Sequence, residues 1–141
     1  NGICIYPEIC NLNIKSMRNK NINKIGIIFN TDYHYESGSH WICVFIDLDK
    51  NIFFFFDSTG DRPQKEIKDL YEKLKSQEKK LKYKSNEKTK HQYKNTECGV
   101  YCLYVIVNLL EEKTTIKKLK DKRISDENME KYRFIFFNHP N

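Results

Sequence analysis

One cysteine in this sequence lies in a setting suited to nucleophilic chemistry. Cys98 falls in the run Thr96–Gly99, directly before the apolar run Val100–Leu110, which is long enough for a buried helix. A thiol attacks as the thiolate, and the positive end of a helix dipole stabilises that anion. Gly99 leaves the approach to the sulfur open. These residues predict a reactive cysteine at the start of a helix.

The other cysteines are interpreted as structural. The five cysteines are odd in number, and no pair has the two-residue spacing of a zinc knuckle or a thioredoxin-like motif. We therefore expect reduced thiols and no metal site. Cys43 lies inside an apolar run, and Cys102 follows Cys98 by four residues within another. Both are typical of small buried hydrophobic residues.

A general base for Cys98 must come from elsewhere in the chain, and His40 has the most suitable setting of the four histidines. It directly precedes the strand-like run that begins at Trp41. A residue at a strand end is held by a rigid sheet and can still face a cleft. His34 in a polar loop, His91 in a lysine-rich segment and His139 near the C-terminus are interpreted as surface histidines. Alone, even His40 would more often be structural than catalytic.

Two further polar residues can serve this pair. Asp57 closes the next strand-like run, and a hairpin from His40 to Asp57 would bring a carboxylate beside the imidazole to orient it. Gln92 lies six residues before Cys98, close enough for its amide to donate to a developing oxyanion with the backbone N–H of Cys98. Taken singly, an acidic turn residue and an exposed glutamine on an edge strand are the simpler descriptions. Together, the four residues supply a base, an orienting acid, an oxyanion donor and a nucleophile.

Short runs of β-branched and aromatic residues predict the strands that position these residues. They cover residues 25–29, 41–48 and 52–56. The last two runs are apolar nearly throughout, so we expect central strands covered on both faces, joined by a turn at 49–51. Leu81 and Tyr83 alternate with lysines, which predicts an exposed basic hairpin or edge strand near 80–93.

Helical periodicity predicts the remaining elements. A helix opened by Pro63 has one apolar face, made of Ile67, Leu70, Tyr71 and Leu74. A second helix capped by Ser125 has a face made of Met129, Tyr132, Arg133, Phe136 and Phe137. Residues 19–24 are interpreted as a loop. No repeat or linker divides the sequence, so residues 1–141 are expected to form a single domain.

Length, hydropathy and charge narrow the class of protein. No stretch approaches the roughly 18 uncharged apolar residues of a membrane span, and the start lacks a signal-peptide pattern, so we expect an intracellular protein without membrane contact. The net charge of +6 equals that of the segment Lys65–Lys94, in which 11 lysines stand against five acidic residues. This segment predicts either a docking site for DNA or an acidic partner, or a solvated face.

The residue pattern carries a family resemblance. His40-Trp41, Asp57, Gln92 and Cys98-Gly99 together resemble the SUMO-protease and adenovirus-protease clan of cysteine peptidases. The spacings of 17 residues from His40 to Asp57 and six from Gln92 to Cys98 match the SUMO-protease pattern. The local sequences at 37–41 and 91–99 are most similar to members encoded by large nucleocytoplasmic DNA viruses. Family domains usually have further N-terminal elements, which we expect this chain to lack.

The resemblance implies a fold and a set of site residues. The fold is α+β, of the SUMO-protease type within the papain-like cysteine protease superfamily, with a central mixed β-sheet and the nucleophile at the N-terminus of a buried helix. No metal or organic cofactor is implied, and we expect a monomer. The implied catalytic residues are His40, Asp57, Gln92 and Cys98, and the implied substrate-binding residues are Trp41 and Gly99.

The resemblance also implies a protein substrate cleaved after a Gly-Gly-like site, because the glycines pass through a narrow channel in this clan. Processing of viral structural polyproteins, in the host cytoplasm, nucleus or virion, is favoured over removal of SUMO or ubiquitin. A chymotrypsin-like cysteine protease shares the order His, acid, Cys, but its nucleophile lies in a β-barrel loop and not before a long apolar run. Outside the enzymes, the alternatives are an inactive module that binds ubiquitin-like proteins and a nucleic-acid-binding module.

Overall fold

A four-stranded mixed sheet forms the centre of the structure, a computed structural model that describes residues 7–31, 40–94 and 96–137. The spatial order follows the chain: β1 (Lys24–Asn30), β2 (Trp41–Asp47), β3 (Ile52–Phe56) and β4 (Lys82–Ser85). The first three strands pair antiparallel, and β4 pairs parallel with β3. The α+β class and the mixed sheet are therefore confirmed.

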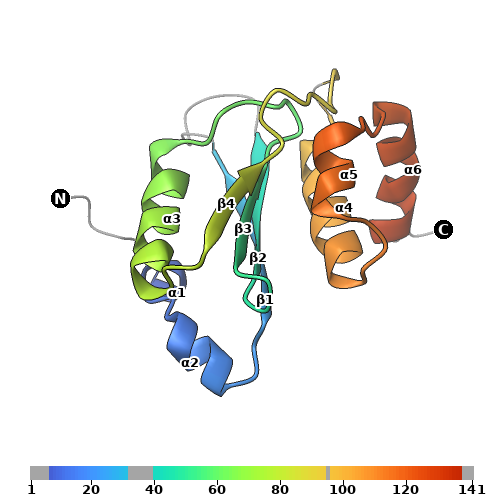
Figure 1. Cartoon of the computed structure of the whole chain (residues 1–141). Coiled ribbons are helices and arrows are strands. Elements are labelled where there is room, and N and C mark those ends of the chain that lie inside the picture. The colour runs from blue at the N-terminus through green and yellow to red at the C-terminus, as the bar shows by residue number, and fades with distance from the viewer. Residues whose placement is uncertain (1–6, 32–39, 95, 138–141) are drawn as a thin grey trace.

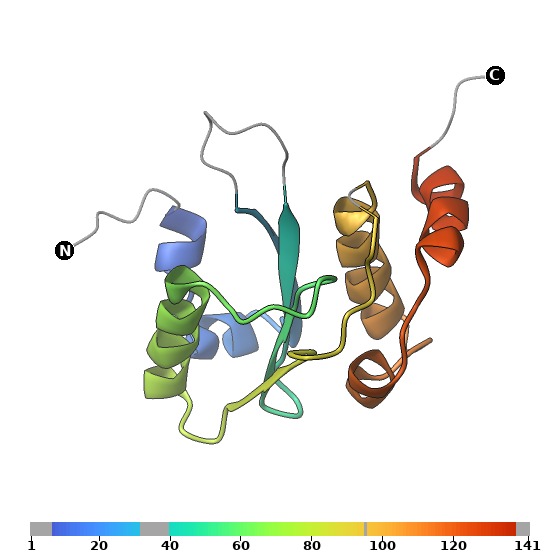
Figure 2. The same ribbon diagram turned by 90° about the horizontal axis from the view of Figure 1, so that it is seen from above.

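One layer of helices covers each face of the sheet (Figures 1 and 2). One layer contains α1 (Pro7–Cys10), α2 (Ile14–Asn19) and α3 (Lys65–Gln77), and the other contains α4 (Cys98–Leu110), α5 (Ile116–Asp121) and α6 (Asp126–Phe136). Successive side chains of a strand point to opposite faces, so the apolar runs of β2 and β3 supply both cores. Phe53 and Phe55 pack toward α3, whereas Phe54 and Phe56 pack toward α4.

Most predicted elements are present. The three strands and their 49–51 turn are confirmed, as is α3, in which the periodic Ile67, Leu70 and Leu74 are buried. Helix α4 begins at Cys98, and Ser125 caps α6 by accepting a hydrogen bond from the N–H of Asn128. The short helices α1, α2 and α5 have too few turns to show periodicity and were not predicted.

Of the two alternatives near 80–93, a hairpin and an edge strand, the structure has the edge strand β4, and the chain after it is a loop. The loop does not pair with a strand; the carbonyl of Ser58 accepts the backbone N–H groups of both His91 and Gln92, at 2.8 Å each. Both side chains are buried, with exposed fractions of 0% and 4%. Polar residues that would mark a surface strand are thus internal anchors.

The expectation of reduced thiols is wrong at Cys10, which is disulfide-bonded, since an odd number of cysteines does not prevent one pair. Cys43, Cys98 and Cys102 are buried and are not disulfide-bonded. Within the described ranges, no helix is long and apolar enough to cross a membrane.

Candidate active site

The ends of β2 and β3 bring His40 and Asp57 together. Antiparallel pairing of Cys43 with Phe56 places the start of β2 beside the end of β3. Nε2 of His40 lies 2.9 Å from Oδ1 of Asp57. The carboxylate is 1% exposed and the imidazole 30%, so the imidazole has one sheltered side and one open side.

A turn and a distant amide fix the orientation of Asp57. Its Oδ1 also accepts the backbone N–H of Thr59 at 2.9 Å and the hydroxyl of Thr59 at 2.7 Å. The buried Asn86 accepts the backbone N–H of Asp57 at 2.9 Å and donates to its carbonyl at 2.6 Å. Gly60 completes the turn with a φ of +76°, and a Cβ there would lie 3.0 Å from the backbone of Thr89. A non-glycine residue would therefore strain this turn.

Sequence reasoning missed Thr59 and Asn86 as supports of Asp57. The available signal for Thr59 was a hydroxyl two residues after a strand-end carboxylate, which is typical of a capped turn. Asn86 had no comparable signal, because its partner lies 29 residues away in the chain.

Cys98 meets His40 at the N-terminus of α4. Burial acts to raise the pKa of this thiol, but hydrogen bonds from His40, from the N–H of Trp41 and from the N–H of Gly99 outweigh it, so the pKa lies below its usual value. Cys98 is buried, with an exposed fraction of 6%. With Nε2 of His40 directed at Asp57, the other ring nitrogen is the one left for the sulfur. The arrangement favours a thiolate at rest.

The imidazole of His40 lies between two groups that favour its protonated form. The hydrogen bond to Asp57 is the largest cause, followed by the bond to Cys98, and both outweigh burial to raise the pKa of His40 to about 10. Burial acts to raise the pKa of Asp57, but hydrogen bonds from His40 and Thr59 lower it overall. Asp57 is therefore ionised at neutral pH while His40 is protonated.

Gln92 is buried in the loop that leads to α4. Its Oε1 accepts the hydroxyl of Ser58 at 2.6 Å, which fixes which end of the amide is the donor. Its Nε2 donates one proton to the carbonyl of Lys94. An amide nitrogen has two protons, and among the described residues no second acceptor contacts this one.

Trp41 and Gly99 flank the sulfur. Trp41 is 36% exposed, and a Cβ built on Gly99 would lie 3.7 Å from its indole Cδ1. An alanine at position 99 would thus fill the space over the indole without a clash. The two predicted substrate-binding residues are neighbours across β2 and α4.

The interpretation of His91 as a surface histidine is wrong, because the side chain is fully buried between Phe56 and Tyr101. Its Nδ1 accepts the N–H of Ile124 at 2.9 Å and its Nε2 donates to the carbonyl of Leu119 at 2.8 Å, so the ring is neutral. Burial is the main cause of a pKa below the usual value for His91. His34, His139 and the motif at 37–39 lie outside the described residues. Among the described residues, no group of His, Cys, Asp and Glu is placed to hold a metal ion.

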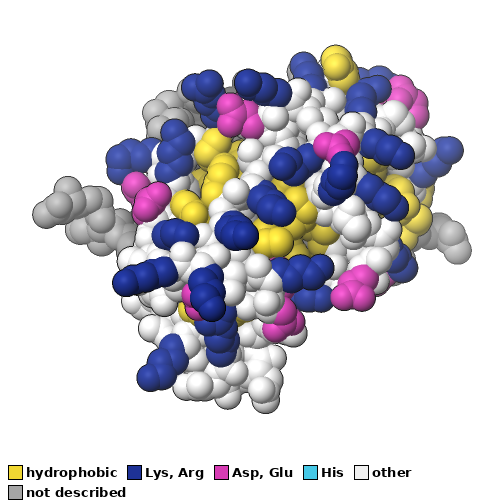
Figure 3. All heavy atoms as spheres, in the orientation of Figure 1, with side chains coloured by type: hydrophobic (Ala, Val, Ile, Leu, Met, Phe, Trp, Pro, Cys, Tyr) yellow, Lys and Arg dark blue, Asp and Glu magenta, His cyan; other side chains and the backbone are white. Residues whose placement is uncertain are grey.

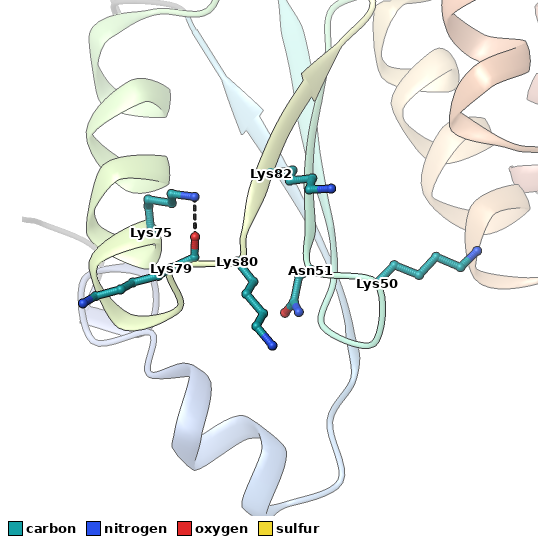
Figure 4. A pocket seen from close by; sticks show the side chains of 6 residues that line it. All are labelled: Lys50, Asn51, Lys75, Lys79, Lys80 and Lys82. Atoms are coloured by element: carbon teal, nitrogen blue, oxygen red, sulfur yellow. Dashed lines mark hydrogen bonds between the residues drawn. The ribbon is translucent and has the colours of Figure 1, made fainter.

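The lysines of the segment Lys65–Lys94 are spread over α3, β4 and the adjoining loops, and Lys and Arg outnumber acidic side chains on that face (Figure 3). Five lysines surround a shallow hollow of about 380 Å³ beside the 49–51 turn (Figure 4). They are Lys50, Lys75, Lys79, Lys80 and Lys82. The turn is at the end of β3 opposite Asp57. The predicted basic segment thus has its densest part at the end of the sheet away from Cys98.

Comparison with known proteins assigns the family. The sequence model of the Ulp1 protease family, C-terminal catalytic domain, matches residues 9–138 of this chain. The chain therefore belongs to this family. A putative thiol protease of Acanthamoeba polyphaga mimivirus is 33% identical over 76% of this chain and 38% of its own length. A cysteine protease of African swine fever virus is 32% identical over 82% of this chain and 44% of its own length, and it is named a SUMO-1 cysteine protease in other isolates.

The fold agrees with that assignment. The crystal structure of the African swine fever virus protease superposes with a TM-score of 0.69 at 30% identity, covering 79% of this chain and 42% of the other. These relatives are from large DNA viruses, as the local sequences at 37–41 and 91–99 predicted. The chain spans less than half the length of these viral relatives.

Proposed function

We propose that this chain is a cysteine protease in which Cys98 attacks, His40 transfers protons, Asp57 orients His40 and Gln92 stabilises the oxyanion. The observation that carries the proposal is the imidazole of His40, which lies between a buried carboxylate at 2.9 Å and the thiol at the start of α4. A nucleophile, its base and an orienting group in mutual contact define nucleophilic acyl transfer. The family assignment supports the same chemistry.

The reaction proceeds in two halves. The Cys98 thiolate adds to the peptide carbonyl carbon, and the resulting oxyanion accepts hydrogen bonds from the second Nε2–H of Gln92 and from the backbone N–H of Cys98. Protonated His40 gives its proton to the leaving amine, which breaks the C–N bond and leaves a thioester. Neutral His40 then takes a proton from water, whose hydroxide displaces the sulfur and releases the carboxylic acid. Asp57 stabilises the protonated imidazole in both halves.

A peptide with a Gly-Gly-like cleavage site is the substrate that fits this site best. The family resemblance implies a narrow channel at Trp41 and Gly99, beside the sulfur, through which glycines can pass. Processing of a viral polyprotein, in host cytoplasm, nucleus or virion, is favoured by the viral relatives, both named proteases. Removal of a ubiquitin-like modifier is the alternative, in line with the name SUMO-1 cysteine protease given to one relative.

A ubiquitin-like probe with a C-terminal electrophile tests the proposal. We expect covalent capture at Cys98, detected by mass spectrometry, and hydrolysis of a Gly-Gly peptide that Cys98→Ala abolishes. Cys102→Ala is the matched control, because it removes another buried thiol one helical turn away, and it should retain activity. Labelling at Cys102 or Cys43 with Cys98 spared would refute the assignment. Binding of the probe without capture would instead indicate an inactive binding module.

We also propose that an acidic partner, DNA or an acidic protein face, docks at the five-lysine hollow. The lining of the hollow has no acidic side chain among the described residues. Lys75 is held by the carbonyls of Lys79 and Leu81, which leaves the other four lysines pointing outward (Figure 4). The affinity of the unchanged protein for DNA or for an acidic substrate should fall as the salt concentration rises. A variant with Lys79, Lys80, Lys82 and Lys84 all changed to Gln should lack this salt-dependent affinity. Salt-independent binding, equal in both proteins, would leave a solvated face.

A further inference from the structure

Helix α6 holds the segment between Gln92 and Cys98 with one face. Asp126, Glu130 and Arg133 are spaced by four and three residues, so they share a face of the helix. Asp126 is 2% exposed, and its Oδ2 accepts the backbone N–H groups of Tyr93 at 3.0 Å and Lys94 at 3.2 Å. The ammonium of Lys94 lies 3.4 Å from Glu130. This end of the segment is fixed just after Gln92.

Arg133 holds the other end just before Cys98. Its Nε lies 3.1 Å and its Nη2 3.0 Å from Oε2 of Glu97, whose side chain is 5% exposed. Its Nη2 also donates to the carbonyl of Thr96 at 2.7 Å. The guanidinium therefore fixes both the side chain and the backbone that enter α4, a geometry that its rigid fork of donors allows.

These contacts connect α6 to both proposed oxyanion donors. Asp126 fixes the backbone N–H of Lys94, and the carbonyl of Lys94 in turn accepts a proton from Nε2 of Gln92. Arg133 fixes Thr96 and Glu97, and the Glu97–Cys98 peptide plane contains the N–H that would face the oxyanion. A small shift of either end would move one donor relative to the other.

We propose that Asp126 and Arg133 are positioning residues that set the separation of the two oxyanion donors, an inference that rests on the proposed function. Met129, Tyr132 and Phe136 pack α6 against α4, and Oδ1 of Asp126 adds one polar contact to that helix by accepting the hydroxyl of Tyr101 at 3.0 Å. Buried carboxylates lose hydration on folding, so apolar packing alone gives no reason for Asp126 and Glu97 to be internal. Positioning of the loop between Gln92 and Cys98 gives a reason for their burial.

Two reactions of Cys98 separate this role from general stability. A peptide aldehyde forms a thiohemiacetal whose oxygen needs the oxyanion donors, whereas iodoacetamide alkylates the thiolate and needs only the His40–Cys98 pair. Arg133→Lys and Asp126→Asn should each lower kcat and weaken aldehyde binding by about 10- to 100-fold, with KM nearly unchanged. Their alkylation rates should stay within about twofold of the unchanged protein. Lys131→Gln, an exposed residue of the same helix, is the control and should change neither reaction.

Each outcome decides a different point. Variants that match the unchanged protein in aldehyde binding and kcat would overturn the inference and leave the proposed function intact. Parallel losses in both reactions would also overturn it, because the nucleophile itself would then be disturbed. An unchanged protein that neither hydrolyses peptide nor binds aldehyde would overturn the proposed function, and the inference with it.

Discussion

His40 contacts an acid on one side and a sulfur on the other, and its charge depends on both. The buried Asp57 raises the pKa of His40, and the protonated His40 in turn lowers the pKa of Cys98. Both pKa shifts favour a thiolate at Cys98 paired with a protonated His40 before substrate arrives. The proposed catalytic step then needs no separate deprotonation of the thiol.

Asp57→Asn should keep the fold and lower kcat by about 10⁴-fold, because an amide neither stabilises the protonated imidazole nor selects its tautomer. Thr59 can still donate to the remaining oxygen, so the turn should survive. Steady-state kinetics with a Gly-Gly peptide measure the loss, and circular dichroism checks the fold. A kcat near that of the unchanged protein would transfer the orienting role to another residue.

The rate of hydrolysis should be constant through neutral pH and fall at about pH 10, where His40 loses the proton that the leaving amine needs. Because the folded-state pKa of His40 is above its unfolded value of about 6.5, its contribution to stability is complete below that pH and is lost toward pH 10. Alkylation of Cys98 should lack the alkaline fall, since a thiolate remains after His40 is neutral. A fall in hydrolysis near pH 7 would contradict the ion pair.

At the scale of elements, the site lies where three element ends are adjacent: the start of β2, the end of β3 and the start of α4. Pairing of β2 with β3 and packing of α4 on β2 set these ends with buried apolar side chains. The described residues between β4 and α4, 86–94 and 96–97, are not in a helix or strand, and polar contacts with Asp57, Ser58 and α6 help to hold them. The least regular part of the site is therefore the most dependent on individual side chains.

Asn86→Asp tests that dependence. The aspartate can still accept the N–H of Asp57, but it cannot donate to the carbonyls of Asp57 and Thr89. Leaving buried carbonyls without a donor and burying a charge should lower the free energy of unfolding by about 1–3 kcal/mol at neutral pH. Urea titration measures this loss. Replacement of the exposed Lys88, two residues away, by Gln is the control and should leave the midpoint unchanged.

The elements that were predictable from sequence are those with periodic apolar residues. The apolar alternation and runs of β2, β3, α3 and α4 repeat over several residues, and they place His40, Asp57 and Cys98 at element ends. Contacts between single polar residues far apart in the chain have no period. Asn86 and Asp57 are 29 residues apart, and His91 and Leu119 are 28 residues apart. Neither contact was therefore predictable from the sequence. Both lie around the loop that carries Gln92.

At the scale of the whole molecule, the two ends of the sheet differ. One end has Asp57, His40 and Cys98, and the other has the 49–51 turn and the five-lysine hollow. The five residues of β3 separate them by roughly 17 Å at about 3.3 Å per residue. An acidic partner at the hollow would therefore dock at the end of the sheet opposite the proposed catalytic residues.

The buried His91 links acid stability to the packing of α4, α5 and the loop. Its pKa is lowered in the folded state, so the unfolded chain binds the proton more readily and the free energy of unfolding should fall as pH drops below about 6.5. The slope should approach about 1.4 kcal/mol per pH unit for this group. The variant His91→Asn has no imidazole to protonate. Its midpoint of urea unfolding should be lower at neutral pH, and it should fall less as the pH is lowered. Equal acid dependence in both proteins would contradict the assignment.

Strand β4 is an edge of the sheet, and lysines stand at alternate positions along it. An edge strand has backbone N–H and C=O groups that can accept a strand from a second molecule. If two copies paired through β4, Lys82 and Lys84 of each copy would face lysines of the other, and mutual repulsion would oppose the pairing. The same charges that give the face its basic character therefore protect the protein from edge-to-edge aggregation. High salt, or acetylation of these lysines, would remove that protection.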